Sequence, residues 1–405
     1  MLLFLLPFAA VAQTMTYDVF IKTVAEKNTG YLAERYSIDI AEANLQAARV
    51  FNDPELSVEY GNNQDWNLQM GQSVDVGLSY DLDLAGVRKA RIAVARSESE
   101  ITEASVAACL ANLKFEASQA WAEAWRLRRT CEVLEASVRD MWQIARSDSL
   151  RLTVGDIGRA DATQSRLEAQ ALSGELRTML SEYSNALRNL SFLCGGEPVT
   201  EIADDFLPSR EMPFTEEAVC DMAEANRADL KSAELSRTLS ENNLRLVKAS
   251  RAFDLGLNLG WSYNTLVRNE IAPAPKFNGL VVGVSIPLKF SSMNKGEVQA
   301  ARAEVLQSQK YYESASGQVR LEASSAYNSL MAACEVLRQY DETMMAEAES
   351  IVESRRTGYL KGESSLVELL SAQQTYRDIM QAWIDASCFR YLCQAQLEQA
   401  IGSAW

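Results

Sequence analysis

The sequence predicts a membrane protein of mixed α+β class, in which long antiparallel helical hairpins join four β-strands that cross a bilayer. Three observations predict this class. Four segments alternate apolar residues with small or acidic ones, the long stretches between them consist of good helix formers, and the same order of elements occurs twice in 405 residues. Each alternating segment has about 9–11 residues, the length of a tilted strand crossing a bilayer.

The clearest strand is predicted at residues 72–83. Successive side chains of a strand point to opposite faces, so this segment has one apolar and one polar face. The apolar face carries Val74, Val76, Leu78, Tyr80 and Leu82, and the polar face carries Ser73, Asp75, Gly77, Ser79, Asp81 and Asp83.

Three further strands are predicted at 54–62, 254–264 and 279–288. Their polar faces are formed by Gly, Ser, Asn and acids with almost no Lys or Arg, which suits a water-filled lumen, and their aromatic residues lie towards the strand ends, as in an interfacial girdle. An ordinary sheet with one face on a soluble core is the alternative. The acids expected to line the lumen, where they would favour cations, are Glu55, Glu59, Asp75, Asp81 and Asp83.

The composition argues against several functions. A formal net charge of −16 disfavours nucleic acid as a partner. The chain has no histidine, the commonest general base and transition-metal ligand. No nucleophile elbow, phosphate loop or dinucleotide fingerprint is present. We therefore expect no catalytic residue, no metal site and no cofactor.

The first residues resemble a secretory signal. Residues 2–11 are apolar, and Ala10-Val11-Ala12 has the small-x-small form of a cleavage site, so residues 1–12 are predicted to be a signal peptide. A short buried helix is the alternative. The mature chain would begin near Gln13, and no N-terminal lipid anchor is expected on it.

The first repeat is predicted to span residues 13–198. A helix capped by Thr16 runs to about Val50, where Asn52-Asp53-Pro54 stops it before the first two strands. The hairpin 87–194 follows: a helix over about 87–147, a turn at 148–158 and a returning helix at 159–193. A segment this long without proline or glycine suits an antiparallel coiled-coil hairpin.

The second repeat is predicted at 214–405, after an irregular linker at 199–213. Thr215 opens its first helix, the strands 254–264 and 279–288 follow, and the hairpin is 294–402. In that hairpin a helix over about 294–356 turns at 357–363. The offset of about 200 residues between the halves is expected of a duplicated unit.

One chain has too few strands to seal a membrane. Membrane barrels have at least about eight strands, and open sheet edges are not tolerated in lipid. Two chains would supply eight strands and a filled lumen, and three chains would supply twelve strands and a channel. The chain is therefore expected to assemble, with its hairpins gathered below the strands.

These features resemble the TolC-type outer-membrane efflux duct family over almost the whole chain. Residues 54–61 resemble the family's first strand. Residues 82–91 resemble its strand-to-helix junction, closer to the heavy-metal, RND cation efflux subgroup, and residues 358–373 resemble its second hairpin tip. The resemblance implies a homotrimer with a 12-stranded β-barrel in outer-membrane lipid and a periplasmic α-barrel. It also implies a periplasmic adaptor (membrane fusion protein) and, indirectly, an inner-membrane RND or ABC transporter.

The resemblance also implies functional residues at the hairpin tips. The family's gate tyrosine corresponds to Tyr359 and its first ring acid to Glu368, whereas Ser364 and Ser371 stand where the family has a gate arginine and a second ring acid. The adaptor would contact the tips at Leu152, Val154, Gly155, Asp156, Gly358 and Gly362.

The sequence thus predicts a passive exit duct for small molecules, drugs or metal cations, gated at its periplasmic tips. The alternatives are a soluble periplasmic coiled-coil adaptor or scaffold and a type I secretion duct.

Seven cysteines without a CxxC pair indicate buried thiols. Two pairs reach similar heights along the hairpins and are candidates for disulfides: Cys109 with Cys194, and Cys334 with Cys388.

Overall fold

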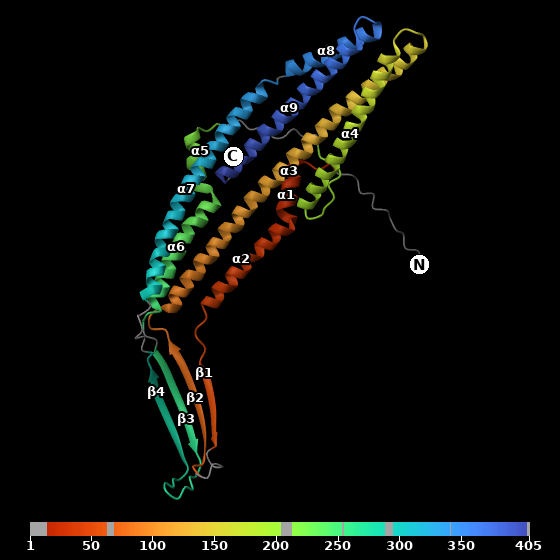
Figure 1. The fold of residues 1–405 in the computed structure, drawn as a ribbon. Coiled ribbons are helices and arrows are strands. Elements are labelled where there is room, and N and C mark those ends of the chain that lie inside the picture. The colour runs from red at the N-terminus through yellow and green to blue at the C-terminus, as the bar shows by residue number, and fades with distance from the viewer. Residues whose placement is uncertain are drawn as a thin grey trace, which may run out of the picture. The chain divides into compact units, whose positions relative to one another are not determined.

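The computed structural model describes residues 14–62, 69–203, 213–252, 255–287, 295–340 and 342–402. The predicted signal peptide (1–12), most of the linker (199–213) and the last residue of the predicted strand 279–288 lie outside these ranges. The elements are α1 (Tyr17–Lys27), α2 (Thr29–Ala48), β1 (Glu55–Asn62), β2 (Gln72–Leu82), α3 (Val87–Thr153), α4 (Arg159–Leu193), α5 (Glu216–Asn226), α6 (Ala228–Ala249), β3 (Leu255–Asn264), β4 (Phe277–Ser285), α7 (Lys295–Arg338), α8 (Glu342–Lys361) and α9 (Leu366–Ile401) (Figure 1).

The chain divides into two compact units, each built from several segments. Unit 1 contains Met1–Arg35, Val106–Ala228 and Ser316–Trp405, and unit 2 contains Tyr36–Ser105 and Asp229–Ala315. Each unit therefore takes residues from both predicted repeats. The repeats themselves stay a prediction, although the order of helices and strands from α1 to α4 recurs from α5 to α9 with two helices, α7 and α8, in the place of α3.

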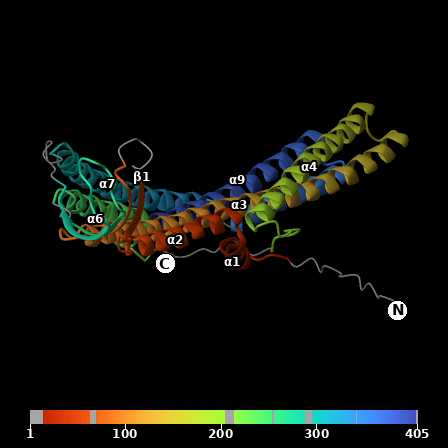
Figure 2. The ribbon, with the colours of Figure 1, turned by 90° about the horizontal axis from the view of Figure 1, so that it is seen from below.

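Unit 2 holds a four-stranded antiparallel sheet in the order β1-β2-β3-β4. The register places apolar residues opposite one another: Leu56, Leu78, Leu259 and Val282 share one position across the sheet. In the same unit α6 and α7 lie side by side in both views (Figures 1 and 2), and the Arg237 guanidinium lies 5.5 Å from the centroid of the Tyr312 ring.

Unit 1 holds the main hydrophobic core, where α1 packs against α3, α4 and α9. Trp121 and Trp125 of α3 are fully buried at its centre. The Phe20 ring of α1 lies 5.2 Å from Trp121, and the Tyr17 ring lies 5.8 Å from that of Tyr391 on α9. These large aromatic contacts fix the short N-terminal helix to the long hairpins.

The helix predicted from Thr16 to about Val50 is wrong as a single element, because it is broken at Asn28. The Asn28 side-chain oxygen accepts a hydrogen bond from the N–H of Tyr31 at 3.0 Å, and its amide group donates to the Leu193 carbonyl at 3.1 Å. Asn28 therefore caps α2 and ties it to α4. Thr16 precedes α1 but makes no side-chain capping hydrogen bond, whereas the Thr215 hydroxyl accepts one from the N–H of Ala218.

Three other predicted boundaries are corrected. The single helix predicted over about 294–356 is two helices, α7 and α8. α3 continues to Thr153, so the turn predicted at 148–158 is shorter, and α8 continues to Lys361, beyond the start of the turn predicted at 357–363. In the first hairpin no glycine or proline occurs after Gly86 until Gly155, and so nothing ends α3 earlier.

No helix in the described ranges is both long enough and apolar enough to cross a bilayer.

The turn after α4 requires a glycine, which gives a stability prediction. Gly195 has φ +71°, and a Cβ there would lie 2.3 Å from the Lys27 carbonyl oxygen. We predict that Gly195→Ala lowers the free energy of unfolding by about 1–2 kcal/mol or more, measured by denaturant titration with circular dichroism.

Gly174→Ala is the matched control, since Gly174 lies inside α4 with open space around its Cα. Alanine there should raise stability by about 0.5–1 kcal/mol, because glycine disfavours a helix interior. Equal effects of the two substitutions would contradict this account of the turn.

Candidate functional site: the hairpin tips and the polar sheet face

The tips of the two hairpins in unit 1 end in the same turn. Gly155 after α3 and Gly362 after α8 have φ values of +78° and +79°, in the left-handed region. The N–H of Asp156 donates to the Arg151 carbonyl at 2.9 Å, and the N–H of Glu363 donates to the Gly358 carbonyl at 2.8 Å. Both helices thus stop in a glycine-terminated cap that leaves a narrow tip.

The first tip exposes apolar side chains to solvent. Val154 is 79% exposed and Leu150 is 70% exposed, whereas Leu152 is 37% exposed. Arg151 is held to Asp156 by a salt bridge of 2.6 Å between Nε and Oδ2. The predicted adaptor-contact residues Leu152, Val154, Gly155 and Asp156 therefore lie together at one accessible turn.

Behind the tips, a buried cluster connects the two hairpins. Its members come from α3, α4, α8 and α9 and are Met141, Ile144, Ala145, Ala169, Leu172, Tyr359, Leu366 and Leu369. Figure 1 shows α3 beside α4 and α8 beside α9 near these turns, and Figure 2 shows the same pairs.

Tyr359 and Asp148 form the polar centre of this cluster. The Tyr359 hydroxyl donates a hydrogen bond of 2.9 Å to Oδ1 of Asp148, and both residues are buried, at 5% and 0% exposed. The other carboxyl oxygen, Oδ2, has no hydrogen-bond partner among the described residues. Burial, followed by the hydrogen bond and the negative charge of Asp148, raises the pKa of Tyr359, so its hydroxyl stays a donor.

Arg151 approaches the same tyrosine from the first hairpin. Its Nη1 donates to the Tyr359 carbonyl at 3.3 Å, and its guanidinium lies 5.4 Å from the centroid of the Tyr359 ring. One residue of the second hairpin, Tyr359, therefore contacts two residues of the first. The sequence predicted that Asp148 begins a turn, but Asp148 lies in α3. The one sequence signal for this position is the lack of a glycine or proline between Gly86 and Gly155.

The other predicted gate residue, Glu368, lies at the start of α9. It completes a capping box with Ser365, in which each side chain accepts a hydrogen bond from the other residue's backbone N–H. Its Oε2 also lies 3.3 Å from Nη1 of Arg355 on α8. The Ser364 hydroxyl, at the position expected to hold a gate arginine, donates to the Arg355 carbonyl at 3.1 Å. Within one chain these contacts hold α8 against α9.

Gly358, a predicted tip residue, lies inside α8 where the turn folds back. A Cβ there would lie 2.8 Å from the Ser364 hydroxyl oxygen, so the glycine allows the close approach of the two segments.

The polar face of the sheet in unit 2 carries the predicted lumen acids. Glu59 of β1 lies opposite Asp75 of β2, and Glu55 lies opposite Ser79. Like charges on directly opposed residues disfavour a sheet, so this pairing has a cost that a structural role alone does not explain. Asp83 lies just beyond β2, where its carboxylate accepts hydrogen bonds from the N–H groups of Val87 and Arg88 at 2.8 and 2.6 Å and so caps α3.

Small residues fill most of the rest of this face, and Asn258 and Val281 are among the larger ones. A Cβ on Gly77 would lie 2.5 Å from the Ser57 hydroxyl oxygen, and one on Gly279 would lie 2.5 Å from that of Ser262. Serine hydroxyls thus lie over glycines of the neighbouring strand, and the face carries little side-chain volume. Such a face can become the concave side of a curved sheet.

All seven cysteines carry free thiols. Neither Cys109 and Cys194 nor Cys334 and Cys388 are joined, so the disulfides considered for these pairs are absent. Burial raises the pKa of Cys131 and Cys194 to about 11 and that of Cys388 to about 12. These thiols are protonated at neutral pH and behave as small apolar residues.

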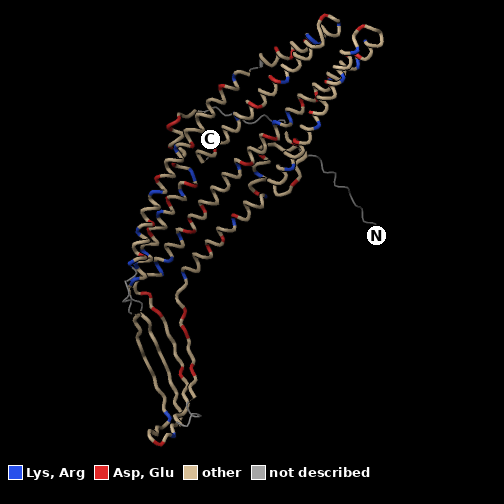
Figure 3. Tube along the Cα trace, in the orientation of Figure 1, with Lys and Arg blue, Asp and Glu red and all other residues tan. Residues whose placement is uncertain are grey.

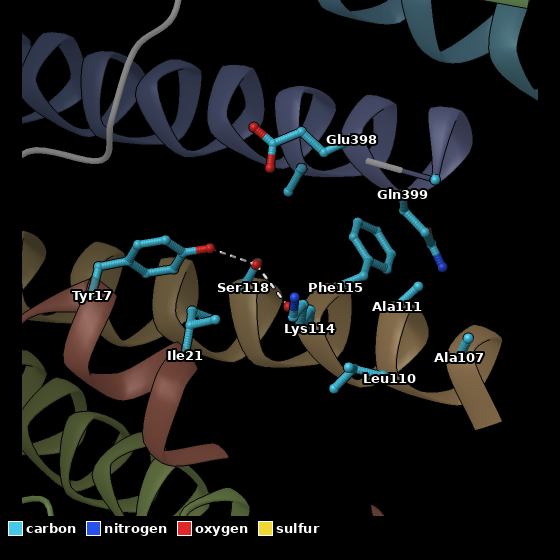
Figure 4. Close-up of a pocket in the computed structure, with 12 residues that line it drawn as sticks. Tyr17, Ile21, Ala107, Leu110, Ala111, Lys114, Phe115, Ser118, Glu398 and Gln399 are labelled. Atoms are coloured by element: carbon cyan, nitrogen blue, oxygen red, sulfur yellow. Dashed lines mark hydrogen bonds between the residues drawn. The ribbon is translucent and has the colours of Figure 1, made fainter. Parts of the chain in front are cut away.

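One pocket of about 430 Å³ lies in unit 1 between α1, α3 and α9 (Figure 4). The Tyr17 hydroxyl forms a hydrogen bond of 2.9 Å with the Ser118 hydroxyl at its wall, and Lys114 and Glu398 are its charged lining residues. In the described ranges no group of three or more His, Cys, Asp or Glu residues is placed to hold a metal ion.

Comparison with known proteins shows what this chain is similar to. The sequence signature of the outer membrane efflux protein family matches residues 219–403. The chain is also 23% identical over 369 residues to the cobalt-zinc-cadmium resistance protein CzcC of Cupriavidus metallidurans, a match covering 90% of this chain and 84% of CzcC. Residues 219–403, somewhat less than half of the chain, therefore resemble outer membrane efflux proteins.

Solved structures agree with this resemblance in fold. A CusC structure aligns with a TM-score of 0.79 at 18% identity over 96% of this chain and 92% of CusC. The outer membrane protein VceC of Vibrio cholerae aligns with a TM-score of 0.76 at 16% identity over 96% of both chains. The predicted fold class, outer-membrane location and general role as an efflux duct are confirmed.

The cluster behind the tips of this efflux protein gives a testable prediction. Tyr359→Phe removes the hydrogen bond that the tyrosine hydroxyl donates to the Asp148 carboxylate, and an unsatisfied buried polar group costs about 1–3 kcal/mol. Amides of residues 355–362 should therefore exchange with deuterium about tenfold faster or more, measured by mass spectrometry.

Tyr36→Phe serves as the control, since Tyr36 is 67% exposed. It should leave exchange at 355–362 unchanged. Unchanged exchange in Tyr359→Phe as well would show that the hydrogen bond does not hold the tips together.

Proposed function

We propose that this efflux protein is a homotrimeric exit duct that passively conducts metal cations and other small solutes from the periplasm to the outside. In this proposal its hairpins lie in the periplasm, where a membrane fusion protein docks and connects the duct to an inner-membrane RND or ABC transporter. The duct itself has no catalytic step, and the transporter supplies the energy.

The exposed apolar face of the sheet is the observation that carries this proposal. Leu56, Val58 and Tyr60 of β1 are 63–66% exposed, and Leu280 and Val282 of β4 are 73% and 76% exposed. A soluble adaptor or scaffold would leave this contiguous face in water, which monomeric soluble proteins avoid. Lipid is the environment in which such a face is stable.

The edges of the same sheet support assembly. β1 and β4 are its outer strands, and in the described ranges no further strand of the chain pairs with either. Backbone N–H and C=O groups that remain unpaired in hydrocarbon cost several kcal/mol each. Pairing β1 of one copy with β4 of the next satisfies them, and three copies supply the twelve strands of a barrel.

Cation transport is supported by the charge on the polar face. Glu55, Glu59, Asp75 and Asp81 lie on it, and the strands bring no lysine or arginine to offset them. A lumen lined with carboxylates concentrates cations. The printed name of the relative CzcC, a cobalt-zinc-cadmium resistance protein, is consistent with metal cations as the cargo.

Gating at the tips is supported by the contacts within unit 1. Tyr359 joins the two hairpins through Asp148, and Glu368 joins α8 to α9 through Arg355. An adaptor that binds the tips, at Leu152, Val154, Gly155, Asp156, Gly358 and Gly362, would shift the equilibrium between closed and open tips if it contacted the open form better.

Ion selectivity in planar bilayers tests the proposal. Reconstituted protein should form conducting pores that prefer K⁺ over Cl⁻, read from the reversal potential in a salt gradient. The combined substitutions Glu55→Gln, Glu59→Gln, Asp75→Asn and Asp81→Asn should move the reversal potential towards zero, because they remove the carboxylates of the polar face.

A matched variant neutralises four exposed acids of unit 1: Asp18→Asn, Glu26→Gln, Glu217→Gln and Asp221→Asn. It changes the net charge equally and should keep the selectivity of the parent protein. Absence of any pore, or equal selectivity in all three proteins, would contradict the proposal.

A further inference from the structure

Basic residues are missing from the strands and, apart from Arg268 and Lys276 in the loop between β3 and β4, return where the strands meet the helices. β1, β2, β3 and β4 contain no lysine or arginine. Figure 3 shows no blue along the described strands and blue segments where the helices of unit 2 begin. In a chain of net charge −16 this pattern calls for a partner of negative charge at one level of the molecule.

We propose that these residues form a binding surface for anionic phospholipid headgroups. The surface, here called the junction cations, consists of Arg49, Arg88, Lys89, Arg91, Lys248, Arg251 and Lys295. The inference rests on the proposed function, because it requires the apolar sheet face to lie in lipid. It adds the class of lipid that the protein recognises and the residues that recognise it.

Each of the four passages between strand and helix brings at least one junction cation. Arg49 follows α2 and precedes β1, and Lys89 lies in the first turn of α3 after β2. Lys248 is in the last turn of α6 before β3, and Lys295 is the first residue of α7 after β4. Since neighbouring strands are paired in register, their ends bring these residues to one level of unit 2.

The lysines of this surface are available to a ligand. Lys89, Lys248 and Lys295 are exposed, and in the described ranges none of them forms a salt bridge. Elsewhere in the chain Lys27 and Lys310 are paired with Glu197 and Glu313. Unpaired lysines facing solvent are free to approach phosphate groups.

Two arginines hold the surface in place. Arg88 donates through Nε to the Arg49 carbonyl at 2.9 Å, and Arg91 donates through Nη2 to the Val50 carbonyl at 3.0 Å. They satisfy carbonyl groups at the end of α2 and connect it to α3. Their charge remains near the surface even though these donors are occupied.

Exposed apolar residues lie in the same passages. Phe51 is 65% exposed with the Arg88 guanidinium 3.9 Å from its ring centroid, and Leu84 is 68% exposed. An aromatic or aliphatic side chain beside a cation is the combination that anchors proteins at a membrane interface. The junction cations are thus continuous with the apolar face that ends at the same level.

Acids in the described part of these passages do not cancel the surface. Asp83 is engaged in capping α3, and Asp53 and Glu297 are the others. Within the described ranges none of the three forms a salt bridge with a junction cation. Glu55 and Asp81 at the adjoining strand ends bring these acids to five against seven junction cations, so the local balance is positive in a protein whose overall charge is strongly negative.

Lipid selectivity provides the test. The protein is reconstituted into phosphatidylcholine bilayers with trace spin-labelled phosphatidylglycerol or spin-labelled phosphatidylcholine, and the motion-restricted fraction gives the relative association constant of the two lipids. A lysine near an anionic surface contributes about 1 kcal/mol, which is about fivefold in binding. We expect a preference of about fivefold or more for phosphatidylglycerol, lost in 1 M NaCl because the charges are screened.

The variant Lys89→Gln, Lys248→Gln, Lys295→Gln should bring this ratio down towards one. The control Lys22→Gln, Lys231→Gln, Lys310→Gln removes three exposed lysines elsewhere and should keep the ratio of the parent protein. Circular dichroism confirms that both variants are folded before lipids are compared.

Two results would overturn the inference while leaving the duct intact: equal association of both lipids with the parent protein, or an equal fall in both variants. Equal association would leave a protein partner or a neighbouring copy as the occupant of the surface. Failure of the parent protein to float with vesicles of either lipid would overturn the proposed duct, and this inference with it.

Discussion

The hydrogen-bonding requirement of β-strand backbones in lipid is the constraint on which the rest of this structure depends. Four strands pair with one another in register, but the outer edges of β1 and β4 have no partner within the described chain. Water could satisfy such edges, whereas hydrocarbon cannot. The exposed apolar face excludes water as the environment of that side, and so the edges require neighbouring copies. The proposed assembly of several copies around a common lumen follows from this requirement.

The faces of the sheet divide two tasks between residue types. In the proposed duct, lipid stabilises the Leu, Val and aromatic residues on one face, and the glycine, serine and carboxylates on the other face leave space and negative charge for a cation path. Opposed Glu59 and Asp75 are unfavourable for an isolated sheet. The presence of these two acids is understandable if ion conduction, rather than the stability of the sheet, determines which residues occupy the polar face.

The hairpin tips follow a different physical principle, that of a small buried polar centre. Asp148 is fully buried and retains one carboxyl oxygen without a hydrogen-bond partner in the described part of the chain, so only a few polar contacts hold the arrangement around Tyr359. The proposed gate needs two arrangements of similar free energy. A partner can shift the equilibrium between them only by the difference in its affinity for the two.

The strands could be predicted from sequence to within about three residues, since a period of two with alternating chemistry is the pattern of a β-strand and does not fit a helix. The largest difference is at the strand predicted at 279–288, which the structure places at Phe277–Ser285. The helix breaks could not. Asn28 ends one helix and caps the next through contacts with α4 that only the fold supplies, and the separation of α7 from α8 lacks glycine or proline. The predicted site was likewise incomplete. Tyr359 and Glu368 came from a resemblance, whereas Asp148 meets Tyr359 only because the two hairpins lie side by side, and Arg355 meets Glu368 only because α8 folds back on α9.

The mass of the detergent-solubilised protein tests the central claim most directly. Light scattering coupled to size-exclusion chromatography, corrected for bound detergent, should give the mass of three copies of the 44.9 kDa chain or of its processed form. The circular dichroism spectrum of the same sample should contain a β-strand contribution. A folded monomer that keeps its β signal would contradict the account, because its sheet edges would then need no neighbour.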